Sequence, residues 1–321
     1  MSMDEMKNLA IQTSALGTKC VVLTGGEPTL IRHKELCNYF RFVKKETSIS
    51  NIRIVTNGYW AKNYDHAYSI LKDWKDAGLD ELNVSCGEFH QEYVPIENIV
   101  HAYKAGCNLD FKTVLLAGEF TKSKLENKMT PYDFEKVLGC RVKQHHEISP
   151  FVSNKHAITY NCAVCYGRGK NYIKPEDIPL VKYENLPNTC KSTIASLSLH
   201  PDGCVTICCG VGARDVNFLN IGNWRDEKLK KITDRTKDDL FTNLISFYGL
   251  KKLKEKLMAT CPECGLAHRL FYAGPCDLCF ELFTNKKVLD YLNTNGFELE
   301  DELISRKIMH LSTIRSSKYV Y

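Results

Sequence analysis

The stretch Cys20-Val21-Val22-Leu23-Thr24-Gly25-Gly26-Glu27-Pro28 joins a short apolar run, rich in β-branched residues, to a glycine pair. Similar apolar runs begin near Ile52, Leu82 and Leu109 (through Leu116), so a unit of about 30 residues repeats along the first part of the chain. Between these runs, apolar residues recur at i, i+3, i+4 and i+7, which is the period of a helix. This alternation predicts parallel βαβ units, in which a helix follows each strand.

Local signals place the ends of several helices. Gly78 and Gly106 follow apolar helical patterns and are expected at helix C-termini. Thr130-Pro131 is expected to open a short helix, with the threonine as N-cap and the proline as first helical residue. A further helix is expected from Met3 to about Ala15, ahead of the first predicted strand.

Length and composition bound the class of protein. The 321 residues are enough for about two domains of roughly 150 residues. An apolar content of 44% with 25% charged residues excludes wholesale disorder. No apolar run approaches the roughly 20 residues of a membrane-spanning helix, and no signal-peptide pattern is seen. The net charge of +5, from 43 basic and 38 acidic residues, is too balanced to indicate nucleic-acid binding. We therefore expect a cytoplasmic protein that binds neither nucleic acid nor a membrane.

Fifteen cysteines are unusual in a chain of this kind. Their number is odd, and a chain of this length does not need disulfides to fold. The composition therefore predicts reduced thiols, many of them serving a metal.

Small and polar residues follow three successive predicted strands. These segments are Thr24-Gly25-Gly26-Glu27-Pro28, Thr56-Asn57-Gly58 and Ser85-Cys86-Gly87-Glu88-Phe89-His90. Ligands bind at the carboxyl ends of the strands in parallel α/β architectures. A glycine pair allows close approach to the backbone, and a carboxylate beside exposed N–H groups suits a cationic amine. Each segment alone is also compatible with a plain turn; the three together predict a ligand site at this edge.

These segments resemble the radical S-adenosylmethionine (radical SAM) superfamily. Leu23 to Leu30 is similar to that family's GGEP motif, which binds the amino group of the methionine moiety, and Val55-Thr56-Asn57-Gly58 resembles its next strand end. Ser85 to His90 is similar to a Ser-x-Asp-x-Phe-His segment, with Gly87 at the aspartate position. The resemblance implies a partial (β/α)-barrel over residues 1–170 that binds S-adenosyl-L-methionine. The implied cofactor-binding residues are Gly25, Gly26, Glu27, Pro28, Asn57 and Ser85.

The sequence departs from this family at its defining feature. The family's Cys-x3-Cys-x2-Cys loop, which holds a [4Fe–4S] cluster, has no counterpart here, and only 24 residues precede Gly25. We expect either a sequence that begins late or a non-catalytic relative, and favour the first because the later strands keep their cofactor-type ends. Cleavage of S-adenosyl-L-methionine by this polypeptide alone is not expected.

The carboxy-terminal half carries a pattern of metal-binding cysteines. Cys190 is followed after twelve residues by Gly203 and after four more by Cys208, and two Cys-x-x-Cys pairs come later. Thiolates are soft ligands, so these cysteines offer a site for an iron–sulfur cluster or zinc. The predicted metal ligands are Cys190, Cys208, Cys261, Cys264, Cys276 and Cys279, with Cys204 or Cys209 as further candidates.

The spacing of these cysteines, with the His200-Pro201-Asp202-Gly203 turn and Asn220-Ile221-Gly222-Asn223, resembles the SPASM or twitch domains of peptide-modifying radical SAM enzymes. The resemblance implies one or two auxiliary [4Fe–4S] clusters. Eleven residues separate the two pairs, whereas the family pattern runs Cys-x2-Cys-x5-Cys-x3-Cys, so the number of clusters stays open.

The remaining cysteines have simpler interpretations. Cys162-x2-Cys165 is either a further ligand pair or two free thiols. The others are expected to pack as small apolar residues, namely Cys20, Cys37, Cys86, Cys107 and Cys140.

The predicted architecture is α/β: a partial (β/α)-barrel of parallel βα units (1–170), a linker (171–189), a small cysteine-rich α+β domain (190–285) and a C-terminal helix with a basic tail (286–321). Within the second domain, the His200–Gly203 turn predicts a β-hairpin, and one helix is expected from about Asp277 to Leu292.

The predicted function is hydrogen-atom abstraction from a peptide or protein substrate by a radical SAM-type enzyme, with a flavodoxin or ferredoxin as electron donor. The alternatives are a non-catalytic peptide-binding relative and a zinc-stabilised binding protein.

Overall fold

The computed structural model describes residues 1–122, 128–139, 142–144, 156–162, 169, 171–190, 192–193, 195–210 and 212–317. The chain divides into two compact units, Met1–Ala163 and Val164–Tyr321. None of the helices in the described ranges combines the length and the apolar character needed to cross a membrane.

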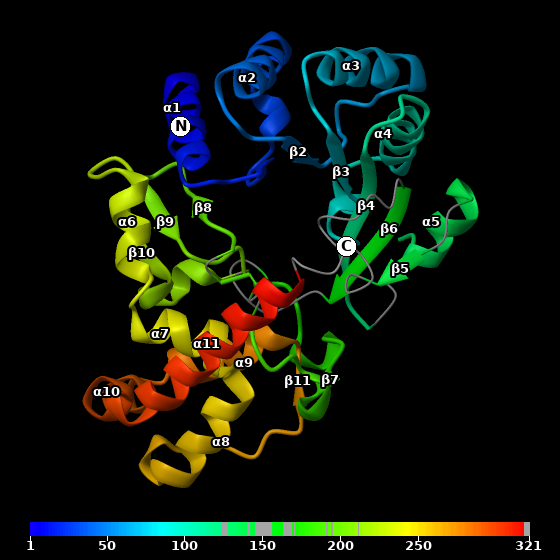
Figure 1. Ribbon diagram of the computed structural model, residues 1–321. Helices are drawn as coiled ribbons and strands as arrows, with labels where there is room; N and C mark the ends of the chain where they lie inside the picture. Colours follow the sequence, from blue (N-terminus) through cyan, green and yellow to red (C-terminus); the bar gives the residue numbers. More distant parts are fainter. Residues whose placement is uncertain are drawn as a thin grey trace. The chain divides into compact units, whose positions relative to one another are not determined.

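The first unit is a parallel sheet with alternating helices, as the repeat predicted (Figure 1). Its described strands are ordered β1-β2-β3-β4-β6-β5, and every pair is parallel. The strands are β1 (Cys20–Leu23), β2 (Asn51–Thr56), β3 (Glu81–Ser85), β4 (Thr113–Phe120), β5 (Val142–Gln144) and β6 (His156–Cys162). The helices are α1 (Met3–Ala15), α2 (His33–Glu46), α3 (Tyr64–Asp76), α4 (Ile96–Asn108) and α5 (Pro131–Leu138). The predicted α/β fold class is confirmed.

Two predicted boundaries in this unit are wrong. The strand predicted from Leu109 begins at Thr113, because Leu109 caps α4 and the chain turns through Asp110 at φ 54°. Gly106 does not end α4 but lies inside it, where a Cβ would stand 2.9 Å from Leu82 Cδ2. This glycine therefore serves close packing of helix on strand. Gly78, at φ +111°, does follow the end of α3 as predicted.

Alternation along the strands builds the core. Ile52 and Ile54 on β2 are fully buried, and they pack with Leu82 and Val84 on β3 in one apolar cluster with the helices. The intervening positions point to the other face, because successive side chains of a strand alternate. That face carries polar residues, including Arg53, Glu81 and Asn83.

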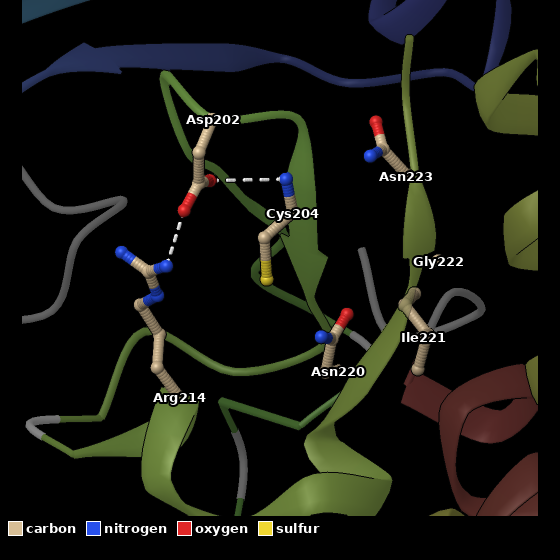
Figure 2. A pocket seen from close by; sticks show the side chains of 7 residues that line it. All are labelled: Asp202, Cys204, Arg214, Asn220, Ile221, Gly222 and Asn223. Carbon is tan, nitrogen blue, oxygen red and sulfur yellow. Dashed lines mark hydrogen bonds and ion pairs between the residues drawn. The ribbon is translucent and has the colours of Figure 1, made fainter. Parts of the chain in front are cut away.

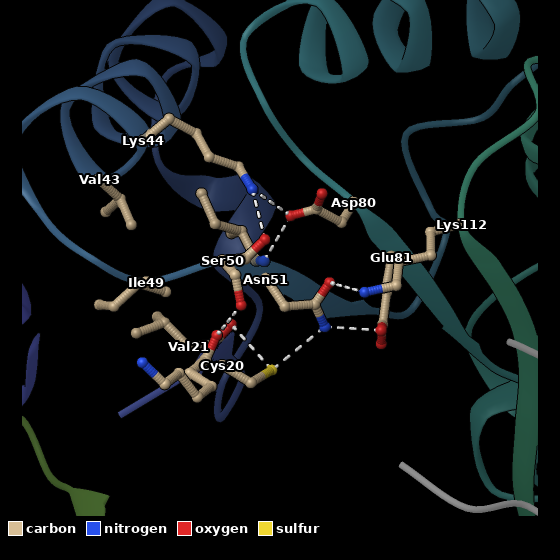
Figure 3. Close-up of polar contacts among 12 residues, drawn as sticks. Cys20, Val21, Val43, Lys44, Ile49, Ser50, Asn51, Asp80, Glu81 and Lys112 are labelled. Atoms are coloured by element: carbon tan, nitrogen blue, oxygen red, sulfur yellow. Dashed lines mark hydrogen bonds and ion pairs between the residues drawn. The ribbon is translucent and has the colours of Figure 1, made fainter. Parts of the chain in front are cut away.

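A polar network fixes the amino ends of the first three strands (Figure 3). Asn51 Nδ2 donates to Glu81 Oε1 over 2.6 Å, and Arg53 Nε donates to Glu81 Oε2 over 2.5 Å. Lys44 Nζ forms an ion pair with Asp80 Oδ2 at 2.7 Å, and the same carboxylate oxygen accepts the Ile52 amide. These contacts stabilise the amino end of the sheet. Ligands are expected at the opposite end, where the strands have their carboxyl ends.

The second unit combines two small antiparallel sheets with a group of helices (Figure 1). Its strands are β7 (Val181–Lys182), β8 (Ser198–Leu199), β9 (Cys204–Thr206), β10 (Asn220–Asn223) and β11 (Phe271–Tyr272), ordered β10-β9-β8 and β11-β7. Its helices are α6 (Leu229–Thr236), α7 (Leu240–Asn243), the π-helix η9 (Leu244–Tyr248), α8 (Leu250–Thr260), α9 (Pro275–Phe283), α10 (Lys286–Asn295) and α11 (Glu300–Ser317). The short 3-10 helices of this unit are η5 (Pro175–Asp177), η6 (Tyr183–Asn185), η7 (Ala213–Asp215), η8 (Asn217–Leu219), η10 (Pro262–Cys264) and η11 (Gly296–Leu299). The first unit has two, η1 (Pro28–Leu30) and η2 (His90–Glu92).

The predicted hairpin is present: β8 and β9 are antiparallel, and the Gly203 amide donates to His200 O across the turn at 3.0 Å. The single helix predicted from Asp277 to Leu292 is instead two, α9 and α10, because Asn285 caps the second one.

Segments outside the predicted cysteine-rich domain also pack in this unit. Strand β7, from the predicted linker, pairs with β11, and Leu292 and Leu303 from the predicted C-terminal region join the core that contains Leu253 and Leu257. The division after Ala163 lies close to the predicted boundary at residue 170.

Candidate cofactor and metal sites

The loop after β1 exposes its backbone at the glycine pair. Gly25 and Gly26 adopt φ +76° and +42°, in the left-handed region that favours glycine. A Cβ at either position would meet nothing within 4 Å, and both residues are exposed. Pro28 is buried and opens η1 directly after the loop. The peptide groups of this pair are therefore accessible to a ligand.

The Glu27 carboxylate binds groups of the chain itself. Its Oε1 accepts hydrogen bonds from Thr29 N at 3.0 Å, Thr29 Oγ1 at 2.6 Å and Thr56 Oγ1 at 2.8 Å, and its Oε2 accepts one from Asn57 N at 2.7 Å. Three of these donors share Oε1 and one binds Oε2, so both carboxylate oxygens are engaged within the chain. Glu27 therefore fixes the β1 loop to the end of β2, and the peptide groups of the glycines remain for a ligand.

Thr56 holds the β1 loop in place, a role that the sequence did not predict. Its hydroxyl donates to Glu27 and accepts the Trp60 indole N–H at 2.9 Å and the Gly58 amide at 3.2 Å. Thr56 is 1% exposed, and Trp60 packs edge-on against Trp74 with ring centroids 5.0 Å apart. The signal available in the sequence was a hydroxyl residue at the last position of a strand, directly before Asn57-Gly58.

The end of β3 brings the third segment to the same edge of the sheet. Ser85 is the last residue of β3 and is half-buried, beside β4. At Gly87, where the resembling family has aspartate, a Cβ would lie 2.9 Å from both the amide nitrogen and the carbonyl oxygen of Glu119. The backbone of β4 thus leaves no room for a side chain. Gly25, Gly26, Asn57 and Ser85 all lie at the carboxyl ends of β1 to β3, as predicted from their positions.

Four of the six predicted metal ligands, together with Cys209, form what we call the thiol cluster: Cys190, Cys208, Cys209, Cys276 and Cys279. Burial, together with the neighbouring thiols Cys209, Cys190 and Cys276, raises the pKa of Cys208 to about 12, although the hydrogen bond from the Gly210 amide lowers it. Burial and the neighbours Cys276, Cys208 and Cys190 likewise raise the pKa of Cys279. Thiols from segments far apart in the sequence therefore share one neighbourhood.

The surroundings of the thiol cluster fit a metal held by thiolates. Cys276 and Cys279 stand at i and i+3 on α9 and so share one face of that helix. The Gly210 amide donates to Cys208 Sγ at 3.0 Å, the type of bond that tunes iron–sulfur sites. A Cβ at Gly210 would lie 3.0 Å from Cys208 Sγ and 3.5 Å from Cys276 Sγ, so the glycine keeps space beside both sulfurs.

The thiol cluster is not a closed ligand shell in this structure. Among the described residues, no three His, Cys, Asp or Glu side chains are placed so that they could hold one metal ion. Thiolates are suitable ligands for zinc or an iron–sulfur cluster, but these sulfur atoms would have to move closer together to bind one.

Cys261 and Cys264 depart from the prediction. They are joined in a disulfide and are each 2% exposed, in the 3-10 turn η10 that follows α8. In this structure neither offers a free thiolate, so the six predicted ligands do not form one set. The Cys-x-x-Cys spacing brings these two sulfurs together in a tight turn.

Cys204 lies in a different environment from the thiol cluster (Figure 2). It lines a cleft of about 620 Å³ with Asp202, Arg214 and the residues of β10. The Cys204 amide donates to Asp202 Oδ1 at 3.1 Å, and Asp202 forms an ion pair with Arg214. Burial raises the pKa of the Cys204 thiol, and the neighbours whose charges alter this pKa are Arg214, which lowers it, and Asp202, which raises it, rather than other cysteines. Cys204 is therefore a suitable control for the thiol cluster.

The other cysteines are mostly packed. Cys37 and Cys86 are buried in the core of the first unit, and Cys107 is partly buried against it, as predicted. Cys20 is half-buried and accepts a weak hydrogen bond from Asn51. Cys140 and Cys165 lie outside the described residues, so the pairing of Cys162 with Cys165 is not described.

Part of the chain is similar to known enzymes. Over 85 residues it is 39% identical to the GTP 3′,8-cyclase of Edwardsiella ictaluri, 36% to that of Cronobacter sakazakii and 38% to that of Klebsiella pneumoniae. Each match covers 26% of this chain and 23% of the relative, so the chain spans about a quarter of the length of these relatives. GTP 3′,8-cyclases are radical SAM enzymes, and the similarity supports a relationship to that superfamily.

Two other comparisons add nothing on function. No protein-family model matches the chain. A solved structure of dihydrodipicolinate synthase from Agrobacterium tumefaciens str. C58 covers 50% of this chain and 58% of its own, at 14% identity and a TM-score of 0.32. A likeness this weak carries no argument.

Proposed function

We propose that this chain is a radical SAM-type protein that acts on a peptide or protein. In this proposal, the carboxyl ends of β1 to β3 hold S-adenosyl-L-methionine, and the thiol cluster holds an auxiliary iron–sulfur cluster. The similarity to GTP 3′,8-cyclases supports the first assignment, and the thiol cluster supports the second. The sequence contains no Cys-x3-Cys-x2-Cys, so the proposal assigns cofactor binding to this chain and not cofactor cleavage.

In the first unit, the peptide groups of Gly25 and Gly26 would contact the methionine moiety, and Ser85 would lie near its carboxylate and ribose. The hydrogen bond between Thr56 and Glu27 keeps the loop in place, and the Asn57 amide donates a second hydrogen bond to the Glu27 carboxylate. When bound, such cofactors supply the chemistry of hydrogen-atom abstraction, and the protein contributes binding and orientation. A flavodoxin or ferredoxin is the proposed electron donor.

The observation that carries the proposal is the meeting of thiols from three separate segments. Cys190 precedes the β8–β9 hairpin, Cys208 follows it, and Cys276 and Cys279 lie on α9. Cysteines that only packed against their neighbours would need no glycine beside them, yet Gly210 leaves space next to the sulfurs of Cys208 and Cys276. Soft thiolate ligands in this number favour iron–sulfur clusters or zinc.

Metal analysis tests this assignment. The wild-type chain, the double variant Cys276→Ser/Cys279→Ser and the control Cys204→Ser are purified without oxygen and reconstituted with iron and sulfide. We expect a brown wild type and control that contain iron and labile sulfide, and a double variant that has lost most of both. An unchanged iron content in the double variant would contradict the ligand assignment.

A zinc-stabilised binding protein is the second candidate, because four thiolates also suit tetrahedral zinc. A colourless protein that carries zinc without sulfide, and loses it in the double variant, would favour this candidate. It would also favour a non-catalytic, peptide-binding role.

A nucleotide is the alternative substrate, since the relatives are named for GTP. Equilibrium dialysis of the anaerobic protein with GTP separates the two classes. The peptide proposal predicts no saturable GTP binding.

A further inference from the structure

The segment that leads to Cys190 runs along α8 and the π-helix η9 and contacts them at several points. Lys251 Nζ donates to Glu184 O at 2.9 Å and to Leu186 O at 3.3 Å. Further along the segment, the Cys190 amide donates to Ile245 O at 3.3 Å. Cys190 is therefore bonded through its own backbone to the π-helix.

Gly249, between η9 and α8, is where this segment passes closest. It adopts φ +99°, in the region that favours glycine, and its amide closes the π-turn onto Leu244 O at 2.8 Å. A Cβ here would stand 2.4 Å from Asn188 O and 3.1 Å from Asn188 C. Real Cβ atoms do not approach backbone so closely, so any side chain at position 249 would displace Asn188, two residues before Cys190.

The π-helix and its flanks are more deeply buried than this segment. Leu244, Ile245, Tyr248 and Leu250 are each at most 2% exposed and lie in the core of the second unit. A displacement forced at Gly249 would therefore move the exposed segment rather than the helix, because cores resist rearrangement.

The π-helix is also costly to keep. Within the described part of the chain, Ser246 Oγ of the π-helix is buried without a hydrogen-bond partner, as are Thr242 Oγ1 and Asn243 Oδ1 at the end of the preceding helix α7. Unsatisfied buried polar atoms are unfavourable, and π-helical turns occur often at functional sites.

We propose that Gly249 and the π-helix η9 position Cys190 for the thiol cluster, so that Gly249 is a positioning residue of the metal site. This inference rests on the proposed function and names a residue that acts on the site only through Asn188 and Cys190. No side chain of η9 needs to touch the metal.

Cobalt(II) binding tests the proposal independently of enzyme activity, because thiolate-to-cobalt absorption reports on the sulfur ligands. The full chain is reduced and titrated without oxygen as wild type, Gly249→Ala, Cys190→Ser and Gly17→Ala. Gly17 is the matched control, since it adopts φ +85° and a Cβ there would meet nothing within 4 Å. It reproduces the backbone strain without the contact.

We expect Gly249→Ala to bind cobalt about 10- to 100-fold more weakly, as for other residues that support metal ligands, with a thiolate absorption like that of Cys190→Ser. Gly17→Ala should match the wild type. A folded Gly249→Ala protein with wild-type affinity and spectrum would overturn this inference and leave the proposed function intact. A wild type that binds no cobalt would overturn both.

Hydrogen exchange of the wild type supplies a second measurement if Gly249→Ala does not fold. The proposal predicts that the Cys190 amide exchanges as slowly as the Gly249 amide, since both are bonded to η9. Fast exchange at Cys190 with protection at Gly249 would overturn it.

Discussion

Replacing Thr56 with valine should loosen the loop that carries Gly25 and Gly26. The Thr56 hydroxyl donates to Glu27 and accepts the Trp60 indole N–H and the Gly58 amide. Valine has almost the same shape but neither donor nor acceptor, so all three bonds are lost while the packing changes little.

The magnitude follows from these bonds. A hydrogen bond to a charged group contributes about 1.5–3 kcal/mol, and a buried donor without a partner costs about 1–3 kcal/mol. Glu27 keeps its other donors and Trp60 is only half-buried, so the lower ends apply to these two bonds; the longer bond from the Gly58 amide, at 3.2 Å, adds little, and the loss is roughly 2–3 kcal/mol. For a unit of this size, 1 kcal/mol shifts Tm by about 2–4 °C, so Tm should fall by roughly 4–12 °C.

Thermal unfolding followed by near-ultraviolet circular dichroism measures this loss, because the packed Trp60–Trp74 pair reports on the first unit. Thr56→Ser is the matched control: it keeps the hydroxyl and loses one methyl group, about 0.8 kcal/mol. If both variants have the same Tm, the hydroxyl contributes nothing and the reasoning is refuted. Binding of S-adenosyl-L-methionine, under the proposed function, should weaken in Thr56→Val and not in Thr56→Ser.

Three further predictions concern charge and protonation. Metal binding must remove protons from thiols such as Cys208, whose pKa is raised to about 12. The affinity for cobalt, measured by competition with a chelator, should therefore rise between pH 6 and 8. An affinity that does not change with pH would contradict this prediction. Burial raises the pKa of Tyr39 from 10.0 to about 12, so the stability linked to this neutral phenol is complete below pH 10 and is lost as pH rises through 12. Tyr39→Phe should lack that dependence in urea unfolding. Asp277→Asn should lower the unfolding free energy by about 1–2 kcal/mol, because the carboxylate accepts bonds from Arg269 and the Ala273 amide; an unchanged urea midpoint would contradict this.

The sequence was sufficient to predict the parallel sheet, because its apolar runs are short, regularly spaced and separated by helical periods. The runs at Ile52 and Leu82 fall within β2 and β3. The strand predicted at Leu109 began too early because its apolar residues serve two elements: Leu109 caps α4, and Phe111 enters the core before β4 starts. Hydrophobicity alone does not separate the end of a helix from the start of a strand.

The residues at the strand ends lie where the sequence predicted, but the hydrogen bonds of Glu27 were not predicted. A carboxylate beside glycines suggested a direct contact with a cationic ligand, whereas Glu27 bonds to Thr29, Thr56 and Asn57. These partners lie up to 30 residues away in the sequence, and only the parallel pairing of β1 with β2 brings them within reach. The role of Thr56 depends on the same pairing and was missed for the same reason.

The two Cys-x-x-Cys pairs described in the second unit show why spacing does not determine what a cysteine pair does. Cys276 and Cys279 follow Gly274-Pro275, which starts helix α9, and the helix holds both thiols free on one face. Cys261 and Cys264 occupy a 3-10 turn that ends at Gly265 in a left-handed conformation, and this turn brings their sulfurs into a disulfide. A helical pair presents both sulfurs to other segments, whereas a pair in a tight turn is placed to bond within itself. The residues around each pair, rather than the two intervening positions, therefore decide which cysteines meet Cys190 and Cys208.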